Sequence, residues 1–326
     1  MSESSNKKRL LYLLRYLQMF TNEEHPIGTS KLEEVLSEAG YEVKSKTIKN
    51  DVDTLIAAGY DVIIRKSTSN QYFYGNQMFE PSEIKLLIDM VSSSRAITEK
   101  QSADIISRLL KLTNQYEAEK LKKCCYGKKK IKAENEQMFY IIDIINRGIA
   151  EKKQISFQYY DYTSECEKVL KHNGAIYHVS PYTLLSNEDK YYMIGYSERR
   201  QDIAIFRVDR MCGADLSDFK YHEKPKHYKE ADYTNGVFKM YPGIMERKVT
   251  IKCDSNLMKC IVDRFGTDIE ITDQTEKDFI TKIKVSVSPT FFSWVFQFAG
   301  KVKIEGPEDV REEYKKVLNE NINLYL

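Results

Sequence analysis

Apolar residues recur at helical spacing through the first part of the chain. Leu10, Leu13, Leu14 and Leu17 share one face of a first helix. A second short helix is expected around residues 31–39. A third is expected over SKTIKNDVDTLIAAG, with Ser45 as its cap. The segments DVIIRK and QYFYG alternate on either side of STSN, which is typical of a β-hairpin. Residues 1–80 are therefore predicted to be three helices followed by a hairpin.

The helical period continues from Pro81 to about residue 151. Ile84, Leu87 and Val91 predict a helix that starts at Pro81, and further helices are expected at about 101–123 and 134–151. Between the last two, residues 122–130 contain five lysines and show no periodicity. We expect this stretch to be an exposed connection.

The period changes to two at residue 154. The strand candidates, separated by polar turns, are ISFQYYDY, IYHVSPYTLL, KYYMIGY and AIFRVDRM. Short strands at this spacing predict a small barrel or sandwich. Residues 215–246 contain scattered proline and glycine with little pattern, and we interpret them as a linker.

The remaining sequence predicts a different order of elements. From residue 247 it reads as strand, helix, strand, strand, helix, strand and a final helix. This βαββαβ order is typical of a ferredoxin-like α/β layer. Its second helix, PTFFSWVFQFAG, is rich in aromatic residues around Trp294. We interpret these aromatic residues as a packed helix and not as a ligand cage.

Composition excludes several classes of protein. Lys+Arg 50 against Asp+Glu 48 gives a net charge of +2, which excludes a uniformly basic nucleic-acid coat. A hydrophobic content of 42% excludes a disordered chain. No apolar run is long enough for a membrane span, and the first residues lack a signal-peptide cleavage site. Six cysteines without CxxC spacing are typical of reduced thiols, so we expect a cytoplasmic protein without a membrane partner.

Motifs for enzyme chemistry are missing from the sequence. It contains no Gly-rich phosphate loop, no HExxH and no GxSxG. We therefore expect no catalytic residues, no cofactor and no metal site.

The exposed face of the third helix has the chemistry of a DNA-contacting surface. In a winged helix-turn-helix this helix enters the major groove, where lysine can contact guanine or phosphate and asparagine suits adenine. The candidate DNA-binding residues are Ser45, Lys46, Thr47, Lys49, Asn50, Arg65 and Lys66, the last two on the wing. Ten positive and ten negative residues through position 75 leave a small helical interaction domain as the alternative.

The central β region contains a second group of candidates. Alternation places Tyr192, Ile194 and Tyr196 on one face, and Arg207 and Arg210 follow on the next strand. Arginines beside tyrosines can bind phosphate and stack on bases. Arg207 and Arg210 would point to opposite faces of an unbroken strand, and one of them could pair with Asp209. The alternative is a solvated edge strand with ion pairs.

Three ordered segments resemble the WYL-domain transcriptional regulators. TIKNDVDTLIAAGYDV is similar to the recognition-helix stretch of that family, and VSPYTLLSNEDKYYMIGY followed by IFRVDRM resembles the WYL core. FFSWVFQFAGKVKIEGPEDVREEY resembles the C-terminal WCX extension. The namesake triad is Tyr191-Tyr192-Met193 here, so Trp and Leu are replaced by Tyr and Met.

The resemblance implies an α+β multidomain protein. Its implied parts are a winged helix-turn-helix (1–80), a helical connector (81–150), a small Sm/SH3-like WYL barrel (151–222), a linker (223–245) and a ferredoxin-like WCX extension (246–326). It also implies that the WYL domain binds a nucleotide or single-stranded nucleic acid through Tyr192, Arg207 and Arg210. Local chemistry adds further effector-binding candidates, namely Ser156, Tyr159, His178 and Arg199.

Two functions are compatible with these features. The first is a ligand-responsive bacterial transcription factor that binds a duplex DNA operator as a homodimer, because winged-helix regulators contact two half-sites with two-fold symmetry. The second is a WYL accessory protein that binds single-stranded RNA or DNA and modulates a nucleic-acid-processing system such as CRISPR. The sequence does not identify the effector or the operator.

Overall fold

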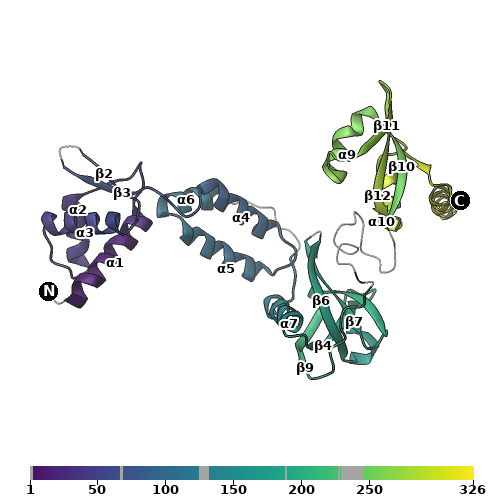
Figure 1. The fold of residues 1–326 in the computed structure, drawn as a ribbon, viewed down its shortest axis with the longest axis horizontal. Helices are drawn as coiled ribbons and strands as arrows, with labels where there is room; N and C mark the ends of the chain where they lie inside the picture. The colour runs from purple at the N-terminus through teal and green to yellow at the C-terminus, as the bar shows by residue number, and fades with distance from the viewer. Residues whose placement is uncertain (1–2, 67–68, 125–131, 188, 227, 229–245) are drawn as a thin grey trace. The chain divides into compact units, whose positions relative to one another are not determined.

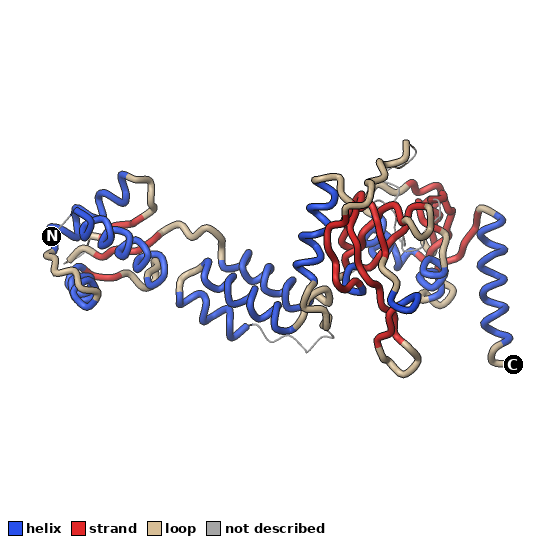
Figure 2. Tube along the Cα trace, turned by 90° about the horizontal axis from the view of Figure 1, so that it is seen from below, coloured by secondary structure: helices blue, strands red, loops and turns tan. Residues whose placement is uncertain are grey.

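The computed structural model describes residues 3–66, 69–124, 132–187, 189–226, 228 and 246–326 (Figure 1). The chain divides into two compact units, Met1–Phe139 and Tyr140–Leu326, and each is described by itself. Helices predominate in residues 3–150 and most strands follow, as the colours of Figure 2 show. The structure is therefore a mixed α and β protein with several separate sheets.

Three helices and a small antiparallel sheet form the first eighty residues. The helices are α1 (Glu3–Phe20), α2 (Thr29–Glu38) and α3 (Ser45–Ala57), and the strands are β1 (Ile27–Gly28), β2 (Val62–Arg65) and β3 (Gln71–Tyr74). The strand order is β1-β3-β2. Leu13, Leu32 and Ile48, one from each helix, are fully buried in a single core. The three helices and the hairpin expected from the apolar pattern are present.

Two local details of this region differ from the sequence-based expectations. The N-cap of α3 is Lys44, whose extended backbone (φ −112°, ψ 164°) precedes the first helical residue, Ser45. The Lys44 carbonyl accepts the N–H groups of Thr47 and Ile48, and no side chain caps the helix. The prediction that Ser45 caps α3 is therefore wrong. The short strand β1, which pairs with β3, was not among the expected elements.

The next region contains three helices. They are α4 (Pro81–Ser93), α5 (Glu99–Leu109) and, after a 3-10 turn at Leu110–Leu112, α6 (Gln115–Cys124). Ile84 and Ile88 of α4 pack against Leu121 of α6. The single helix expected at 101–123 is thus two helices. The break occurs because the Asn114 side chain accepts the N–H groups of Tyr116 and Glu117 and starts a new helix. Most of the lysine-rich stretch, residues 125–131, lies outside the described residues.

A curled sheet dominates the start of the second unit, next to α7 (Met138–Ala150). Its strands are β4 (Gln154–Tyr162), β5 (Lys168–Leu170), β6 (Tyr177–Asn187), β7 (Lys190–Ser197), β8 (Asp202–Arg207) and β9 (Met211–Ser217). The order is β5-β4-β6-β7-β8, and β9 also pairs with β4. Among the described residues β8 and β9 form no ladder with each other, so the expected barrel is an open half-barrel.

The sheet curls around a core of aromatic side chains. The Phe157 ring stacks on Tyr177 at 5.5 Å and meets Phe206 edge-on at 5.2 Å. On β7, Gly195 allows close approach of β6, because a Cβ there would lie 2.4 Å from the Ser180 carbonyl oxygen. The β6–β7 register shifts next to this close approach, between Pro181 and Thr183, and beyond the shift Tyr192 pairs with Leu185.

The segment after β9 remains attached to the half-barrel. The Tyr221 hydroxyl donates to the Pro181 carbonyl at 3.1 Å, and the His222 N–H donates to the Ser180 hydroxyl at 2.9 Å. The Tyr182 hydroxyl donates to the Glu223 carbonyl at 3.1 Å. Most of the expected linker, residues 229–245, lies outside the described residues.

The C-terminal part is a four-stranded antiparallel sheet with helices. Its elements are β10 (Glu246–Asp254), α9 (Met258–Phe265), β11 (Glu270–Gln274), β12 (Asp278–Ser286), α10 (Pro289–Phe296), β13 (Val302–Gly306) and α11 (Glu308–Asn323). The strand order is β11-β12-β10-β13. Trp294 is 9% exposed and Phe291 is fully buried, which confirms that α10 is a packed helix.

Two apolar side chains that suggested a dimer contact are buried inside the chain. From the sequence, Ile84, Leu87, Trp294 and Phe298 are expected to exceed what one small domain buries and to contact a second copy. Ile84 and Trp294 are instead buried in local cores, and Phe298 packs against the same core as Trp294. Ile84 and Trp294 are therefore not available for a dimer contact.

Candidate functional site

The outer face of α3 presents the side chains expected to contact DNA. Ser45, Lys46, Lys49 and Asn50 are exposed, and Thr47 is half-buried. Their helix is held from behind by Ile48, Val52 and Leu55, which are buried in the core. The exposed residues are short, polar or basic, as major-groove contact requires. The structure thus places these five candidates on one helix.

A buried ion pair fixes α3 to α1. The Arg9 guanidinium donates to the Asp51 carboxylate from Nε at 2.7 Å and from Nη2 at 3.0 Å. Arg9 is only 5% exposed, and its hydrogen bonds with Asp51 raise the pKa of Arg9 above its ordinary value. Arg9 is one of the ten positive residues through position 75, but its charge is compensated inside the domain.

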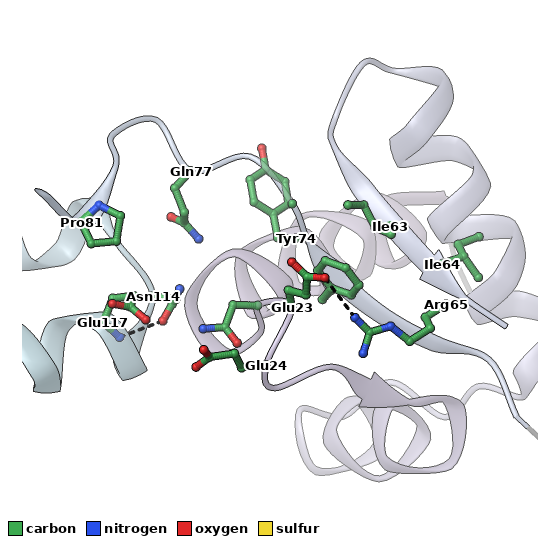
Figure 3. Close-up of a pocket in the computed structure, with 13 residues that line it drawn as sticks. Glu23, Glu24, Ile63, Ile64, Arg65, Tyr74, Gln77, Pro81, Asn114 and Glu117 are labelled. Atoms are coloured by element: carbon green, nitrogen blue, oxygen red, sulfur yellow. Dashed lines mark hydrogen bonds and ion pairs between the residues drawn. The ribbon is translucent and has the colours of Figure 1, made fainter. Parts of the chain in front are cut away.

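The two wing cations have different surroundings. Arg65 and Lys66 are both exposed at the end of β2. The Arg65 guanidinium lies 5.3 Å from the centre of the Phe73 ring and 3.5 Å from the Glu23 carboxylate (Figure 3). Arg65 is therefore engaged within its own domain, a contact that strand alternation did not predict.

In the half-barrel, Tyr192 and Arg207 lie opposite one another on adjacent strands. They are register partners on β7 and β8, so their side chains share one face of the sheet. The next pair, Met193 and Phe206, points to the aromatic core on the other face. Tyr192 is 7% exposed, so its ring is largely covered. The expected proximity of Tyr192 and Arg207 is present.

The Arg207 side chain is bound by a carboxylate. Its Nε and Nη2 donate to the two Asp209 oxygens at 3.1 and 2.8 Å, and Lys190 Nζ lies 2.9 Å from Asp209 Oδ2. Burial alone would raise the pKa of Asp209, but the hydrogen bonds from Arg207 and Lys190 outweigh it and lower that pKa. Asp209 therefore stays ionised at neutral pH and neutralises part of the local positive charge.

Arg210 is not on the same strand as Arg207. Strand β8 ends at Arg207, and Val208–Arg210 form a 3-10 turn before β9 begins. Arg210 Nη1 lies 3.2 Å from Asp161, which is also 2.9 Å from Lys171. The hydrogen bond from Lys171 is the main reason that the pKa of Asp161 is lowered. The expected continuous strand through residue 211 is therefore wrong, and the arginine that pairs with Asp209 is Arg207.

Two tyrosines of β4 complete this cluster. The Tyr159 hydroxyl accepts the Arg207 backbone N–H at 3.1 Å, and the Tyr160 hydroxyl donates to the Asp209 carbonyl at 2.7 Å. Burial raises the pKa of Tyr159, so it remains a neutral phenol. We call the following residues the Arg207 cluster: Tyr159, Tyr160, Asp161, Lys171, Lys190, Tyr192, Arg207, Asp209 and Arg210.

The Arg207 cluster has the charge and the hydrogen-bond donors that an anion site requires. Its four cationic side chains face two carboxylates, which leaves an excess of two positive charges. Arg210 Nε is buried and has no hydrogen-bond partner. A phosphate could replace either carboxylate on its arginine, because phosphate and carboxylate both accept bidentate contacts from a guanidinium.

Three other effector candidates lie outside this cluster. Ser156 and His178 are register partners on β4 and β6, and His178 Nδ1 lies 3.3 Å from the Ser217 hydroxyl. Alternation puts them on the face away from the Phe157 core. Arg199 is exposed in the turn after β7, at the other end of that strand from Tyr192. The structure brings Tyr159, Tyr192, Arg207 and Arg210 together, but not these three.

Several members of the cluster were not among the candidates predicted from the sequence. Lys190 immediately precedes the Tyr191-Tyr192-Met193 triad, so its proximity to Tyr192 was visible in the sequence. Lys171 was not, because it reaches Asp161 from the turn at Lys171–Gly174, where His172 and Asn173 adopt positive φ. Within the described residues no group of His, Cys, Asp or Glu side chains could hold a metal ion. No helix among them is long and apolar enough to span a membrane.

Comparison with known proteins identifies one domain. The model of the WYL domain matches residues 140–216, which include the Arg207 cluster. No curated protein matches the sequence.

Sixteen chains of solved structures match this chain, including the following two. One is the proteasome accessory factor B/C (PafBC) of Arthrobacter aurescens, with 13% identity, 97% of this chain covered and a TM-score of 0.26. The chain covers 48% of that structure, so it spans about half its length. The other is a CRISPR Cas-related protein, with 14% identity, coverage of 99% of this chain and 84% of that one, and a TM-score of 0.36. The match over 140–216, which contains Tyr192 and Arg207, shows that this part of the chain is a WYL domain.

Proposed function

We propose that this protein is a transcriptional regulator that binds duplex DNA and senses a phosphate-containing ligand through its WYL domain. The observation that carries the proposal is the Arg207 cluster, an excess of positive charge beside tyrosines within the matched domain. The ligand we assign to it is a nucleotide or a short single strand. Such a regulator acts in the cytoplasm and needs no cofactor.

The domain plan is part of this proposal. We assign residues 1–80 to a winged helix-turn-helix, 81–150 to a helical connector and 151–222 to the ligand-sensing part. Residues 223–245 are a linker and 246–326 a ferredoxin-like, WCX-like extension. The strand order β11-β12-β10-β13 supports the last assignment, since the first and third strands of a βαββαβ unit lie together at the centre.

The proposed DNA interface is the outer face of α3 together with the wing. Lys46 and Lys49 supply charge, Asn50 can contact a base edge, and Ser45 and Thr47 can donate to phosphate. Lys66 extends this surface along β2. We further propose that two copies bind symmetric half-sites about 34 Å apart, as other winged-helix and helix-turn-helix dimers do.

The test is binding of the full chain to a fluorescent mixed-sequence 30-bp duplex and to a single strand of the same length, over a range of salt concentrations. If a dimer makes about eight phosphate contacts, log affinity for the duplex falls with log salt at a slope near −7. The double variant Lys46→Ala/Lys49→Ala should weaken duplex binding and flatten this slope. The matched control Lys100→Ala/Lys111→Ala removes the same charge from exposed positions on α5 and the turn after it.

Two results would contradict the proposal. Unchanged duplex affinity in Lys46→Ala/Lys49→Ala would exclude α3 as the DNA-contacting helix. Tight binding of the single strand without binding of the duplex would favour the accessory-protein alternative.

A further inference from the structure

A short loop after α1 contacts both the wing and the connector helices. Residues Asn22 and His25 close it, because each donates its backbone N–H to the carbonyl of the other, at 3.4 and 3.1 Å. The Asn22 side chain also accepts the His25 N–H at 2.8 Å. The buried Thr21 hydroxyl accepts the Tyr74 N–H at 3.1 Å and so attaches the start of the loop to β3. The 22–25 loop is therefore a closed, anchored turn.

Three successive side chains of this loop have different partners. The Glu23 carboxylate lies 3.5 Å from the Arg65 guanidinium on the wing. The Glu24 carboxylate lies 3.3 Å from Lys120 on α6. The His25 ring stacks on the Tyr116 ring of α6 at 3.7 Å with an interplanar angle of 8°. The same loop thus joins a wing cation to a connector helix.

These contacts surround a cleft of about 640 Å³ between the wing and the connector (Figure 3). The lining includes Glu23, Glu24 and Glu117 as well as Phe73, Tyr74 and Arg65. Arg65 is 44% exposed and Glu23 is 81% exposed, so solvent and a phosphate can both approach the pair. A phosphate that binds Arg65 would lie close to the Glu23 carboxylate and be repelled by it.

We propose that the 22–25 loop couples the connector to the wing by controlling the availability of Arg65 to DNA. Glu23 competes with DNA phosphate for Arg65. Helix α6 holds the loop that carries Glu23, because Tyr116 stacks on His25 and Lys120 pairs with Glu24. A shift of α6 would withdraw Glu23 and release Arg65 to the duplex. This inference rests on the proposed duplex binding by the winged helix. It adds Glu23 as a residue that limits DNA affinity and α6 as the element that positions it.

The first experiment measures binding of the full chain to the mixed-sequence 30-bp duplex. Glu23→Gln should tighten binding by up to about five-fold, the range of an exposed ion pair, and steepen the log-salt slope by about 0.9 for one added phosphate contact. The matched control is Glu119→Gln, which removes an exposed charge from α6. In an Arg65→Gln background Glu23→Gln should have no effect beyond that of the control.

The second experiment tests the coupling to α6. Tyr116→Ala removes the ring on which His25 stacks, so it should tighten duplex binding in the same direction as Glu23→Gln. This gain should also vanish in the Arg65→Gln background. Circular dichroism of each variant should match that of the unsubstituted protein.

The outcomes separate this inference from the proposed function. If Lys46→Ala/Lys49→Ala weakens binding while Glu23→Gln behaves like Glu119→Gln, the proposed function stands and Glu23 does not compete for Arg65. If Glu23→Gln tightens binding but Tyr116→Ala does not, the coupling to the connector is wrong. If the unsubstituted protein does not bind the duplex, the proposed function fails and this inference fails with it.

Discussion

At the residue scale, the carboxylates of the Arg207 cluster hold the cations of the proposed ligand site in place. Asp209 binds Arg207 through both oxygens and also contacts Lys190, so both cations are fixed before any ligand arrives. A ligand phosphate must displace this carboxylate. The net free energy of ligand binding is therefore the difference between two charge-assisted contacts. Removing Arg207 should weaken ligand affinity, and removing the Asp209 charge should strengthen it.

We expect Arg207→Ala to weaken binding of a fluorescent oligonucleotide or nucleotide by about 10- to 150-fold, the equivalent of losing a charged hydrogen bond of about 1.5–3 kcal/mol. Asp209→Asn should instead tighten binding, because the competing negative charge is gone. Arg200→Ala, an exposed arginine in the turn after β7, is the matched control and should bind normally. Titration with the oligonucleotide and a nucleotide panel measures all three. If Arg207→Ala binds as tightly as Arg200→Ala, the cluster is only a network of ion pairs.

At the element scale, the apolar pattern of the sequence predicted the helices and strands, but it did not predict where two of them are interrupted. The strand candidates in the WYL domain correspond to β4, β6, β7 and β8. Burial alternates along β8, whereas β6 and β7 contain runs of consecutive buried residues. The break at Val208 was missed, since AIFRVDRM keeps its apolar pattern through the 3-10 turn. The start of α6 was missed because Asn114 acts as a cap inside a stretch that otherwise fits one helix. Partners distant in sequence, such as Glu23 and Arg65, left no signal in spacing.

The buried Arg9–Asp51 pair joins α3 to α1 in addition to the apolar core, and this gives a prediction. Arg9→Met leaves the Asp51 carboxylate buried without its partner, which typically costs about 3–5 kcal/mol. We therefore expect faster hydrogen exchange of the α1 and α3 amides in this variant, measured by mass spectrometry on the full chain. The double variant Arg9→Met/Asp51→Leu should recover much of the protection, because no buried charge remains. Equal loss of protection in both variants would show that the pair acts through packing and not through charge.

At the scale of the whole molecule, the proposed function requires that two sites on one chain affect each other. The α3 face belongs to the first compact unit and the Arg207 cluster to the second. A regulator responds to its ligand only if the ligand has different affinities for the DNA-binding and non-binding states. Thermodynamic linkage then requires that the ligand's effect on duplex affinity equals the duplex's effect on ligand affinity.

We expect the single-stranded oligonucleotide, at saturation, to change duplex affinity by some factor, and saturating duplex to change oligonucleotide affinity by the same factor. Typical couplings of about 1–3 kcal/mol correspond to factors of roughly 5 to 150. Fluorescence anisotropy with labels of different colour on the duplex and the oligonucleotide measures both sides. Arg207→Ala should reduce both factors toward one while duplex affinity without oligonucleotide is retained, since Arg207 is not part of the proposed duplex interface.

Direct competition of the two nucleic acids for α3 would instead persist in Arg207→Ala and disappear in Lys46→Ala/Lys49→Ala. Persistence of this kind would show that the oligonucleotide acts at the DNA-binding surface and that the WYL domain is not its sensor.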